Sequence, residues 1–215
     1  MEFVRQLIDF VLHIDKHLLE IINQYGTLTY FILFAIIFAE TGFVVTPFLP
    51  GDSLLFAIGA LSAGGALNVW FIIGLLIVAA FTGNMVNFYI GRYIGPKIFG
   101  YDNIRFIKRE YLVKTQEFYA RHGAKAVVIG RFLPIFRTFV PFVAGIGNMS
   151  YGKFMFFNLL SAVLWVVPFT LAGYWFGNIP FVKNNFTLVV LGIIFITILP
   201  ALFAAIKMRL QKNHV

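Results

Sequence analysis

Long apolar stretches separated by short polar segments make up most of the chain. Three of them, 69–91, 154–177 and 186–206, contain no charged residue and are long enough to cross a bilayer as helices, which takes about 20 apolar residues each. Two others, 28–39 and 124–150, are too short or are interrupted by charges and prolines. Irregular, charged backbone is tolerated at membrane depth only where protein buries it or where it lines a water-filled cavity. We therefore expect both to belong to hairpins that enter the membrane and return.

This pattern predicts an all-α polytopic membrane protein with one integral membrane domain. The first segment is amphipathic, because its polar and apolar residues separate onto two faces of a helix. The expected segments are an amphipathic interfacial helix at 1–24, re-entrant hairpin 1 at 25–67, a transmembrane helix at 68–92, a basic cytoplasmic loop at 93–123, re-entrant hairpin 2 at 124–150, transmembrane helices at 151–178 and 185–207, and a basic tail at 208–215.

The two halves of the chain resemble each other. In the first, Gly59-Ala60-Leu61-Ser62 leads through a spanning helix to Tyr89-Ile90-Gly91-Arg92. In the second, Gly145-Ile146-Gly147-Asn148 leads through another to Ala172-Gly173-Tyr174. A hairpin followed by a helix, twice, with the hairpins entering from opposite faces, is typical of inverted-repeat transporters, whose sites lie where broken helices meet near the midplane. We therefore expect an inverted repeat of re-entrant hairpin plus transmembrane helix.

Composition agrees with a lipid environment and excludes several kinds of site. The 215 residues are 60% hydrophobic and only 12% charged, against about 25% charged residues in soluble domains, and they include 27 Phe. A soluble domain of this size has too little interior to bury so much apolar side chain. Cys is absent, which excludes disulfides, thiolate metal sites and thiol nucleophiles. Acidic residues at 2, 9, 15 and 20 interrupt the N-terminal segment, so we expect no cleavable signal peptide.

The basic residues indicate orientation in the membrane, and we expect no nucleic-acid partner. Residues 1–91 hold two cations and six acids, 92–125 hold eight cations and three acids, and 126–215 hold seven cations and no acid. Short basic segments stay on the cytoplasmic side. An even number of crossings must then separate the basic loop from the basic C-terminus, and two uninterrupted spans already lie between them. Hairpin 2 should therefore not cross, and we expect both basic segments to be cytoplasmic.

Four charged residues lie inside the apolar segments, Glu40 and Asp52 in hairpin 1 and Arg131 and Arg137 in hairpin 2. A charge at membrane depth costs about 2.5 to 3.5 kcal/mol on insertion scales, so each is expected to have a partner or a function. Residues that end helices accompany both pairs and mark the tips of the hairpins. These tip residues are Pro47, Pro50 and Gly51 in hairpin 1 and Pro134 and Pro141 in hairpin 2.

The residues alone leave more than one role open for these charges. Arg presents a fork of N–H donors that matches phosphate, so Arg131 and Arg137 are candidates to bind the phosphate of a lipid headgroup. Alternatively, the hairpin tips meet and the two arginines neutralise Glu40 and Asp52, while Asp52 caps the helix that follows it. The two acids are also candidates for carrying protons, because burial raises a carboxyl pKa and a neighbouring Arg lowers it.

Uncharged polar residues accompany the charged ones. Asn84, Asn87 and Thr138 are candidates to line the same cavity, and hydrogen bonds between helices are the alternative role of the asparagines, including Asn158. His13 and His17 are one helical turn apart, but a solvated polar face explains them best. We therefore expect no metal and no other cofactor, apart from the protons that the acids would exchange in a coupled transporter.

The motifs around the four charges resemble the two signature motifs of the DedA family, within the VTT (SNARE-associated) superfamily. One runs from Glu40 to Pro47-Phe48-Leu49-Pro50-Gly51-Asp52, and the other is Gly130-Arg131-Phe132-Leu133-Pro134-Ile135-Phe136-Arg137-Thr138 followed by Pro141-Phe142-Val143-Ala144-Gly145. The resemblance covers almost the whole chain. It implies a bacterial inner-membrane protein with two opposed re-entrant hairpins, in which the acidic pair and the arginine pair are functional. Many relatives have Asp at the position of Asn84, so a proton-carrying role for Asn84 does not carry over.

The resemblance also implies a function. Relatives are implicated in moving undecaprenyl phosphate or phosphatidylethanolamine across the membrane, and in proton-dependent envelope homeostasis. We therefore expect a flippase-like or scramblase-like transporter of a polyprenyl phosphate or phospholipid, with proton coupling as an open addition. A non-transporting scaffold for membrane assembly and a phosphatidylethanolamine flippase are the alternatives. We expect no enzyme, because a lipid-phosphate phosphatase needs a nucleophilic His and all four His, at 13, 17, 122 and 214, lie outside the spans.

Overall fold

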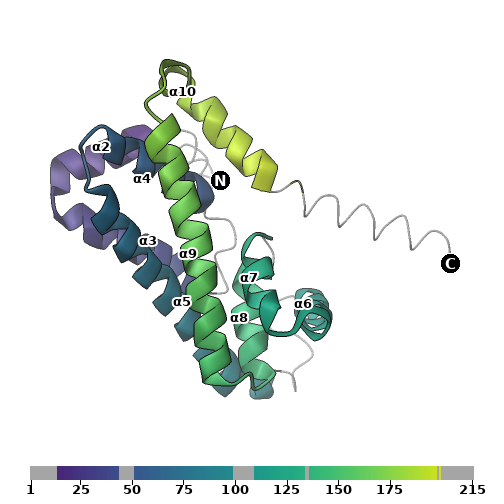
Figure 1. Ribbon diagram of the computed structural model, residues 1–215. Helices are drawn as coiled ribbons and strands as arrows, with labels where there is room; N and C mark the ends of the chain where they lie inside the picture. Colours follow the sequence, from purple (N-terminus) through teal and green to yellow (C-terminus); the bar gives the residue numbers. More distant parts are fainter. Residues whose placement is uncertain (1–13, 44–50, 99–108, 134–135, 198, 200–215) are drawn as a thin grey trace, which may run out of the picture. The chain divides into compact units, whose positions relative to one another are not determined.

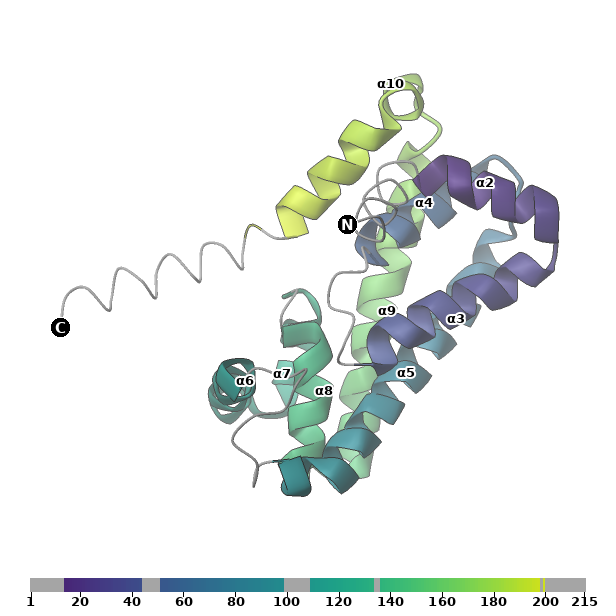
Figure 2. The same cartoon turned by 180° about the vertical axis from the view of Figure 1, so that it is seen from behind.

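Every element of the computed structural model is helical in the residues that it describes, which are 14–43, 51–98, 109–133, 136–197 and 199. The all-α prediction is confirmed for this part of the chain (Figures 1 and 2). The elements are α2 (Ile14–Tyr25), α3 (Leu28–Gly42), α4 (Gly51–Ala63), α5 (Val69–Ile98), α6 (Arg109–His122), the 3-10 helix η1 (Gly123–Lys125), α7 (Ala126–Arg131), α8 (Phe136–Ile146), α9 (Tyr151–Phe176) and α10 (Pro180–Asn184), followed by an apolar helix over Phe186–Thr197.

Two of these helices have the length and composition to cross a bilayer. They are Val69–Ile94 within α5 and Tyr151–Phe176, which is α9, and they coincide with the first two spans expected from the sequence. The third expected span begins with the shorter helix Phe186–Thr197, and its continuation to residue 206 lies outside the described residues. The N-terminal amphipathic helix is likewise described only from Ile14 onward, as α2.

The chain divides into two compact units. Unit 1 consists of Met1–Ile37, Phe48–Ala79 and Val163–Ile194, and unit 2 consists of Phe38–Pro47, Ala80–Ala162 and Phe195–Val215. The continuous helices α3, α5 and α9 therefore each contribute residues to both units. The two halves that resemble each other in sequence are not the two units, because each unit takes helices from both halves of the chain.

Unit 1 contains a very close contact between α4 and α9. A Cβ added at Gly59 of α4 would collide with the carbonyl oxygen of Thr170 on α9, and a Cβ added at Gly173 of α9 would collide with the carbonyl oxygen of Phe56 on α4. Glycine at both positions lets the two backbones approach, as small residues commonly do between membrane helices. On α2, which also packs against α4, Leu18 is fully buried.

Unit 2 contains an equivalent contact between α5 and α8. A Cβ added at Gly91 of α5 would collide with the carbonyl oxygen of Phe142 on α8, and a Cβ added at Gly145 of α8 would collide with the carbonyl oxygen of Phe88 on α5. In both units each glycine contacts a carbonyl three residues before the partner glycine. α4 therefore packs closely against α9, and α8 packs closely against α5.

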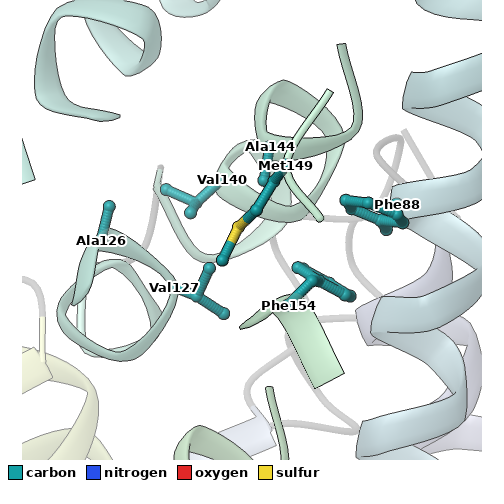
Figure 3. Close-up of a cluster of buried hydrophobic side chains, with 7 residues drawn as sticks. All are labelled: Phe88, Ala126, Val127, Val140, Ala144, Met149 and Phe154. Atoms are coloured by element: carbon teal, nitrogen blue, oxygen red, sulfur yellow. The ribbon is translucent and has the colours of Figure 1, made fainter. Parts of the chain in front are cut away.

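A hydrophobic cluster in unit 2 fixes α7 and α8 against α5 and α9. Figure 3 shows its side chains converging from these four helices and from the turn that holds Met149. At its centre the rings of Phe88 and Phe154 stack with their centroids 4.1 Å apart. This core positions the end of α7 and the body of α8, between which the arginine motif lies. The buried members of the cluster are Phe88, Ala126, Val127, Val140, Ala144, Met149 and Phe154.

The segment expected to be a basic loop, 93–123, is largely helical where it is described. It begins with the last turns of α5 and ends with α6, and residues 99–108 lie outside the described residues. α6 packs against α8, and the ring of its Phe118 stacks on Phe136 with the centroids 4.7 Å apart. Burial also raises the pKa of the Tyr119 hydroxyl on α6 above its ordinary value. The sequence did not predict this helix, because the charged residues of the segment indicated a basic loop.

Candidate functional site

In unit 2 one helix ends and another begins at the charged motifs. α3 ends at Gly42, two residues after Glu40, and α8 begins at Phe136, directly before Arg137. α7 ends at Arg131, so the second motif lies across a break between two helices, as the sequence predicted. The predicted tip residues Pro47, Pro50 and Pro134 lie outside the described residues.

Pro141 does not lie at the break. It was expected at the tip of hairpin 2, but it lies inside α8 and is buried. Proline inside a helix removes one backbone hydrogen bond, and neighbouring helices in a membrane protein can compensate for that loss. α7 therefore ends at Arg131 and α8 begins at Phe136, and Pro141 is part of α8.

Glu40 and Arg137 form a buried ion pair. The Arg137 guanidinium donates from Nη2 to Oε1 of Glu40, and the two side chains are 11% and 1% exposed. The end of α3 thus supplies the acid, and the beginning of α8 supplies the cation. A charged hydrogen bond of this kind is among the strongest in proteins, and breaking it by removing one buried partner is costly.

Asn87 of α5 holds the backbone on both sides of this ion pair. Its Nδ2 donates to the carbonyl oxygen of Thr138, which follows Arg137, at 2.7 Å, and to that of Thr41, which follows Glu40, at 3.4 Å. One fully buried amide therefore connects the end of α3 to the start of α8. Gly83 allows α3 to approach α5 here, because a Cβ at this position would collide with Thr41 Oγ1.

Arg131 belongs to a separate hydrogen-bonded network of unit 2. It is 5% exposed, and its Nη1 donates to Ser161 Oγ at 3.3 Å. The Ser161 hydroxyl donates to the carbonyl oxygen of Asn158 at 2.8 Å, and Nδ2 of Asn84 donates to Asn158 Oδ1 at 2.9 Å. Asn84 and Asn158 therefore connect α5 to α9, which is the helix-to-helix role that the sequence left open for them.

Asp52 belongs to unit 1, where Gly51 begins α4. The sequence placed Asp52 directly before the helix as its cap, whereas Asp52 lies inside α4, in the first turn. The positive end of the helix dipole still favours its carboxylate. Its Oδ1 accepts a hydrogen bond of 2.6 Å from Nε1 of Trp165 on α9, and both side chains are buried.

Trp165 was missed by the sequence reasoning. A tryptophan in an apolar span is ordinarily interpreted as a lipid-facing or core residue. The signal that could have identified it is its N–H group, because a buried indole N–H needs an acceptor and Asp52 is one of the few charged acceptors inside the apolar segments.

Comparison with known proteins identifies the family of these motifs. A model of the VTT domain matches residues 49–175, more than half of the chain. The chain is a member of the DedA family of VTT-domain proteins. The matched residues include Asp52, Arg131 and Arg137, whereas Glu40 precedes them.

Similarity to individual DedA family members covers most of the chain. It is 51% identical to protein DedA of Escherichia coli K12 over 96% of this chain and 95% of the relative. It is 42% identical to an uncharacterized membrane protein of Mycobacterium leprae, over 79% of this chain and 76% of the relative. It is 37% identical to the inner membrane protein YqjA of E. coli K12, over 84% of this chain and 81% of the relative. No solved structure matches the chain.

Proposed function

We propose that this DedA family protein carries a phosphate-bearing lipid across the bacterial inner membrane, with undecaprenyl phosphate as the first candidate cargo. The observation that supports this most strongly is the buried pair of Glu40 and Arg137, held where α3 ends and α8 begins. Broken helices that meet around charged side chains are typical of transporter substrate sites.

Stability alone is a poor explanation for these charges. A buried ion pair seldom stabilises a protein more than well-packed apolar side chains of similar size would. Arg137 and Arg131 offer planar forks that fit phosphate oxygens, and both are held in unit 2 by partners on other helices. We assign Arg137 and Arg131 to binding the lipid phosphate, and we assign Glu40 to holding Arg137 in place when no lipid is bound.

Exchange of partners at Arg137 provides a route to proton coupling. When the lipid phosphate takes over Arg137, Glu40 loses this ion pair. Loss of the neighbouring guanidinium makes the ionised carboxylate less favourable, and this is the step at which we propose that a proton is taken up. Release of the lipid returns Arg137 to Glu40 and releases the proton. We propose that Asp52, in the first turn of α4, is a second acidic residue that takes part in the transport cycle.

The two hairpins are proposed to be re-entrant and related by an inverted repeat. The paired contacts of Gly59 with α9 and of Gly145 with α5 support this, because the same three-residue spacing recurs in both. The distribution of basic residues supports a cytoplasmic position for the central basic segment and the C-terminus. The names of relatives, which include an inner membrane protein and an uncharacterized membrane protein, agree with the proposed location.

A flippase for phosphatidylethanolamine and a non-transporting scaffold are the competing functions. The first uses the same site with a different headgroup, and the second needs no headgroup site. An enzymatic function is not proposed, because a phosphatase needs a reactive His close to the phosphate. His122 lies at the end of α6, and its Nδ1 is 2.9 Å from the carbonyl oxygen of Phe118.

Lipid flux in liposomes that contain only this protein tests the proposal. Undecaprenyl phosphate and phosphatidylethanolamine, each labelled, are compared side by side against liposomes without protein. We expect protein-dependent flux of undecaprenyl phosphate. Flux of phosphatidylethanolamine alone would favour the first competing function, and protein that is folded but moves neither lipid would favour the scaffold.

A further inference from the structure

Asn87 and Thr138 each place a polar atom in the interior of unit 2 without a hydrogen-bond partner. Asn87 is fully buried and Thr138 is 1% exposed. Within the described residues, neither Asn87 Oδ1 nor Thr138 Oγ1 has a hydrogen-bond partner. Such atoms are costly and therefore rare in folded proteins, so two of them beside a functional ion pair require an explanation.

The orientation of the Asn87 amide follows from its neighbours. Its Nδ2 points at the carbonyl oxygens of Thr138 and Thr41, and carbonyl oxygens can only accept hydrogen bonds. Rotating the amide by half a turn would place Oδ1 against these two acceptors. The amide oxygen must therefore face away from both, where it can accept a hydrogen bond from another group.

Both residues are connected to the backbone that carries the Glu40–Arg137 pair. Thr138 follows Arg137 in α8, and Asn87 bridges the carbonyls that follow Glu40 and Arg137. A headgroup that replaces Glu40 at Arg137 therefore arrives beside an acceptor and a hydroxyl that no other group uses in the described chain.

We propose that Asn87 Oδ1 and Thr138 Oγ1 form a subsite for a hydrogen-bond donor that the lipid headgroup carries next to its phosphate. This inference rests on the proposed function, in which Arg137 binds the phosphate itself. Asn87 Oδ1 accepts the donor, and the Thr138 hydroxyl serves as a second acceptor or donates to a phosphate oxygen. The subsite selects a phosphate with a donor over a phosphate without one.

Two kinds of headgroup carry such a donor. A phosphate monoester has a second pKa of about 6, so near pH 6 about half of it carries a P–OH group. An ethanolamine phospholipid carries an ammonium group. The matched lipids without a donor are the methyl ester of the same polyprenyl phosphate and a phosphatidylcholine with the same acyl chains.

Flux of these four lipids at pH 6, in liposomes that contain the full chain, tests the subsite. The ethanolamine and choline lipids differ in the donor and in three methyl groups, and the polyprenyl pair differs in the donor and in the second ionisation of the phosphate. In at least one pair, we expect the lipid with the donor to move at least about fivefold faster than the lipid without it. The reason is that the lipid without a donor leaves the buried acceptor unpaired. The pair with the greater ratio identifies the source of the donor.

Three substitutions locate the preference. Thr138→Val removes the hydroxyl at nearly constant volume and should reduce the ratio within that pair, whereas Thr138→Ser should keep it. Thr170→Val is the matched control, because Thr170 is also fully buried with an unpartnered Oγ1 but belongs to unit 1. Asn87→Leu should bring the ratio of the two fluxes to about one, and it should also weaken the connection between α3 and α8.

The outcomes separate this inference from the proposed function. Equal flux of both members of each pair would overturn the subsite and leave the lipid carrier standing. A preference that Thr138→Val and Asn87→Leu both preserve would also overturn it, because the preference would then arise elsewhere. Absence of flux for all four lipids would overturn the proposed function and the subsite together.

Discussion

The indole N–H of Trp165 donates a 2.6 Å hydrogen bond to the carboxylate of Asp52. The acid lies in the first turn of α4 and the donor lies deep in the apolar helix α9, more than a hundred residues later in the chain. A neutral donor thus satisfies a buried charge in unit 1, whereas in unit 2 the buried acid Glu40 has a charged donor, Arg137. Glu40 therefore accepts a hydrogen bond from a guanidinium, whereas Asp52 accepts one from an indole N–H.

Replacing Trp165 with Phe should destabilise the protein through Asp52. The buried carboxylate loses a charged hydrogen bond, so we expect the free energy of unfolding to fall by about 1.5 to 3 kcal/mol. Circular dichroism during thermal unfolding in detergent measures the change. Trp175→Phe is the control, because Trp175 is 65% exposed and its replacement should have little effect. Equal stability of the two variants would show that the hydrogen bond is unimportant.

Alanine at either interhelical glycine should disturb the packing of its unit. Gly59→Ala and Gly145→Ala each place a methyl group against a backbone carbonyl, and we expect each to cost about 1 to 3 kcal/mol of stability. Gly74 is also helical but has no atom within 4 Å of an added Cβ, so Gly74→Ala should be neutral or slightly stabilising. The same unfolding measurement checks all three. Two glycine variants as stable as Gly74→Ala would contradict the close helix contacts.

Arg131→Lys should impair transport although the charge is kept. Lys offers a compact ammonium in place of the planar fork that reaches Ser161 and, in the proposed function, the phosphate. We expect lipid flux to fall by about tenfold, which corresponds to about 1.4 kcal/mol. Arg121→Lys is the control, because Arg121 is exposed on α6. Unchanged flux in Arg131→Lys would favour simple charge balance.

The orientation can be tested by labelling, because the native chain has no Cys. Single cysteines at Asn103 and Asn213, both outside the described residues, should behave alike toward an impermeant thiol reagent, since both are expected in the cytoplasm. Each should react in inside-out vesicles and not in intact cells. Labelling of one site from outside would contradict the proposed topology.

The helices and their breaks could be predicted from the sequence because the signals are local. Uninterrupted apolar runs predicted α5 and α9, and the charged, proline-containing motifs predicted the breaks around Gly51 and after Arg131. α6 was not predicted, since a polar helix that packs through a few aromatic side chains such as Phe118 has little periodic signal. The sequence predicted Pro141 at the tip of hairpin 2. That prediction was wrong because a helix tolerates an internal proline only where its neighbours compensate, and the sequence does not show those neighbours.

Pairings between distant segments were less predictable. The sequence indicated that Gly59 resembles Gly145 and that Gly91 resembles Gly173, but similarity does not specify which of them pack together. In the structure α4 packs against α9 and α8 packs against α5, because the glycines of each pair allow the two backbones to come close. For the same reason the residues alone offered pairing of the acids with the arginines only as one alternative, and they did not indicate that Glu40 in particular binds Arg137 or that Asp52 binds Trp165.

The central claim is that Arg137 binds the lipid phosphate and that Glu40 is its resting partner. A double-mutant cycle of Glu40→Gln and Arg137→Gln, with stability and undecaprenyl phosphate flux measured on the same samples, tests it most directly. Each single change breaks the ion pair and should cost about 3 to 5 kcal/mol of stability together with flux. The double variant should recover stability but not flux. Recovery of flux together with stability would show that the ion pair is structural and that the phosphate binds elsewhere.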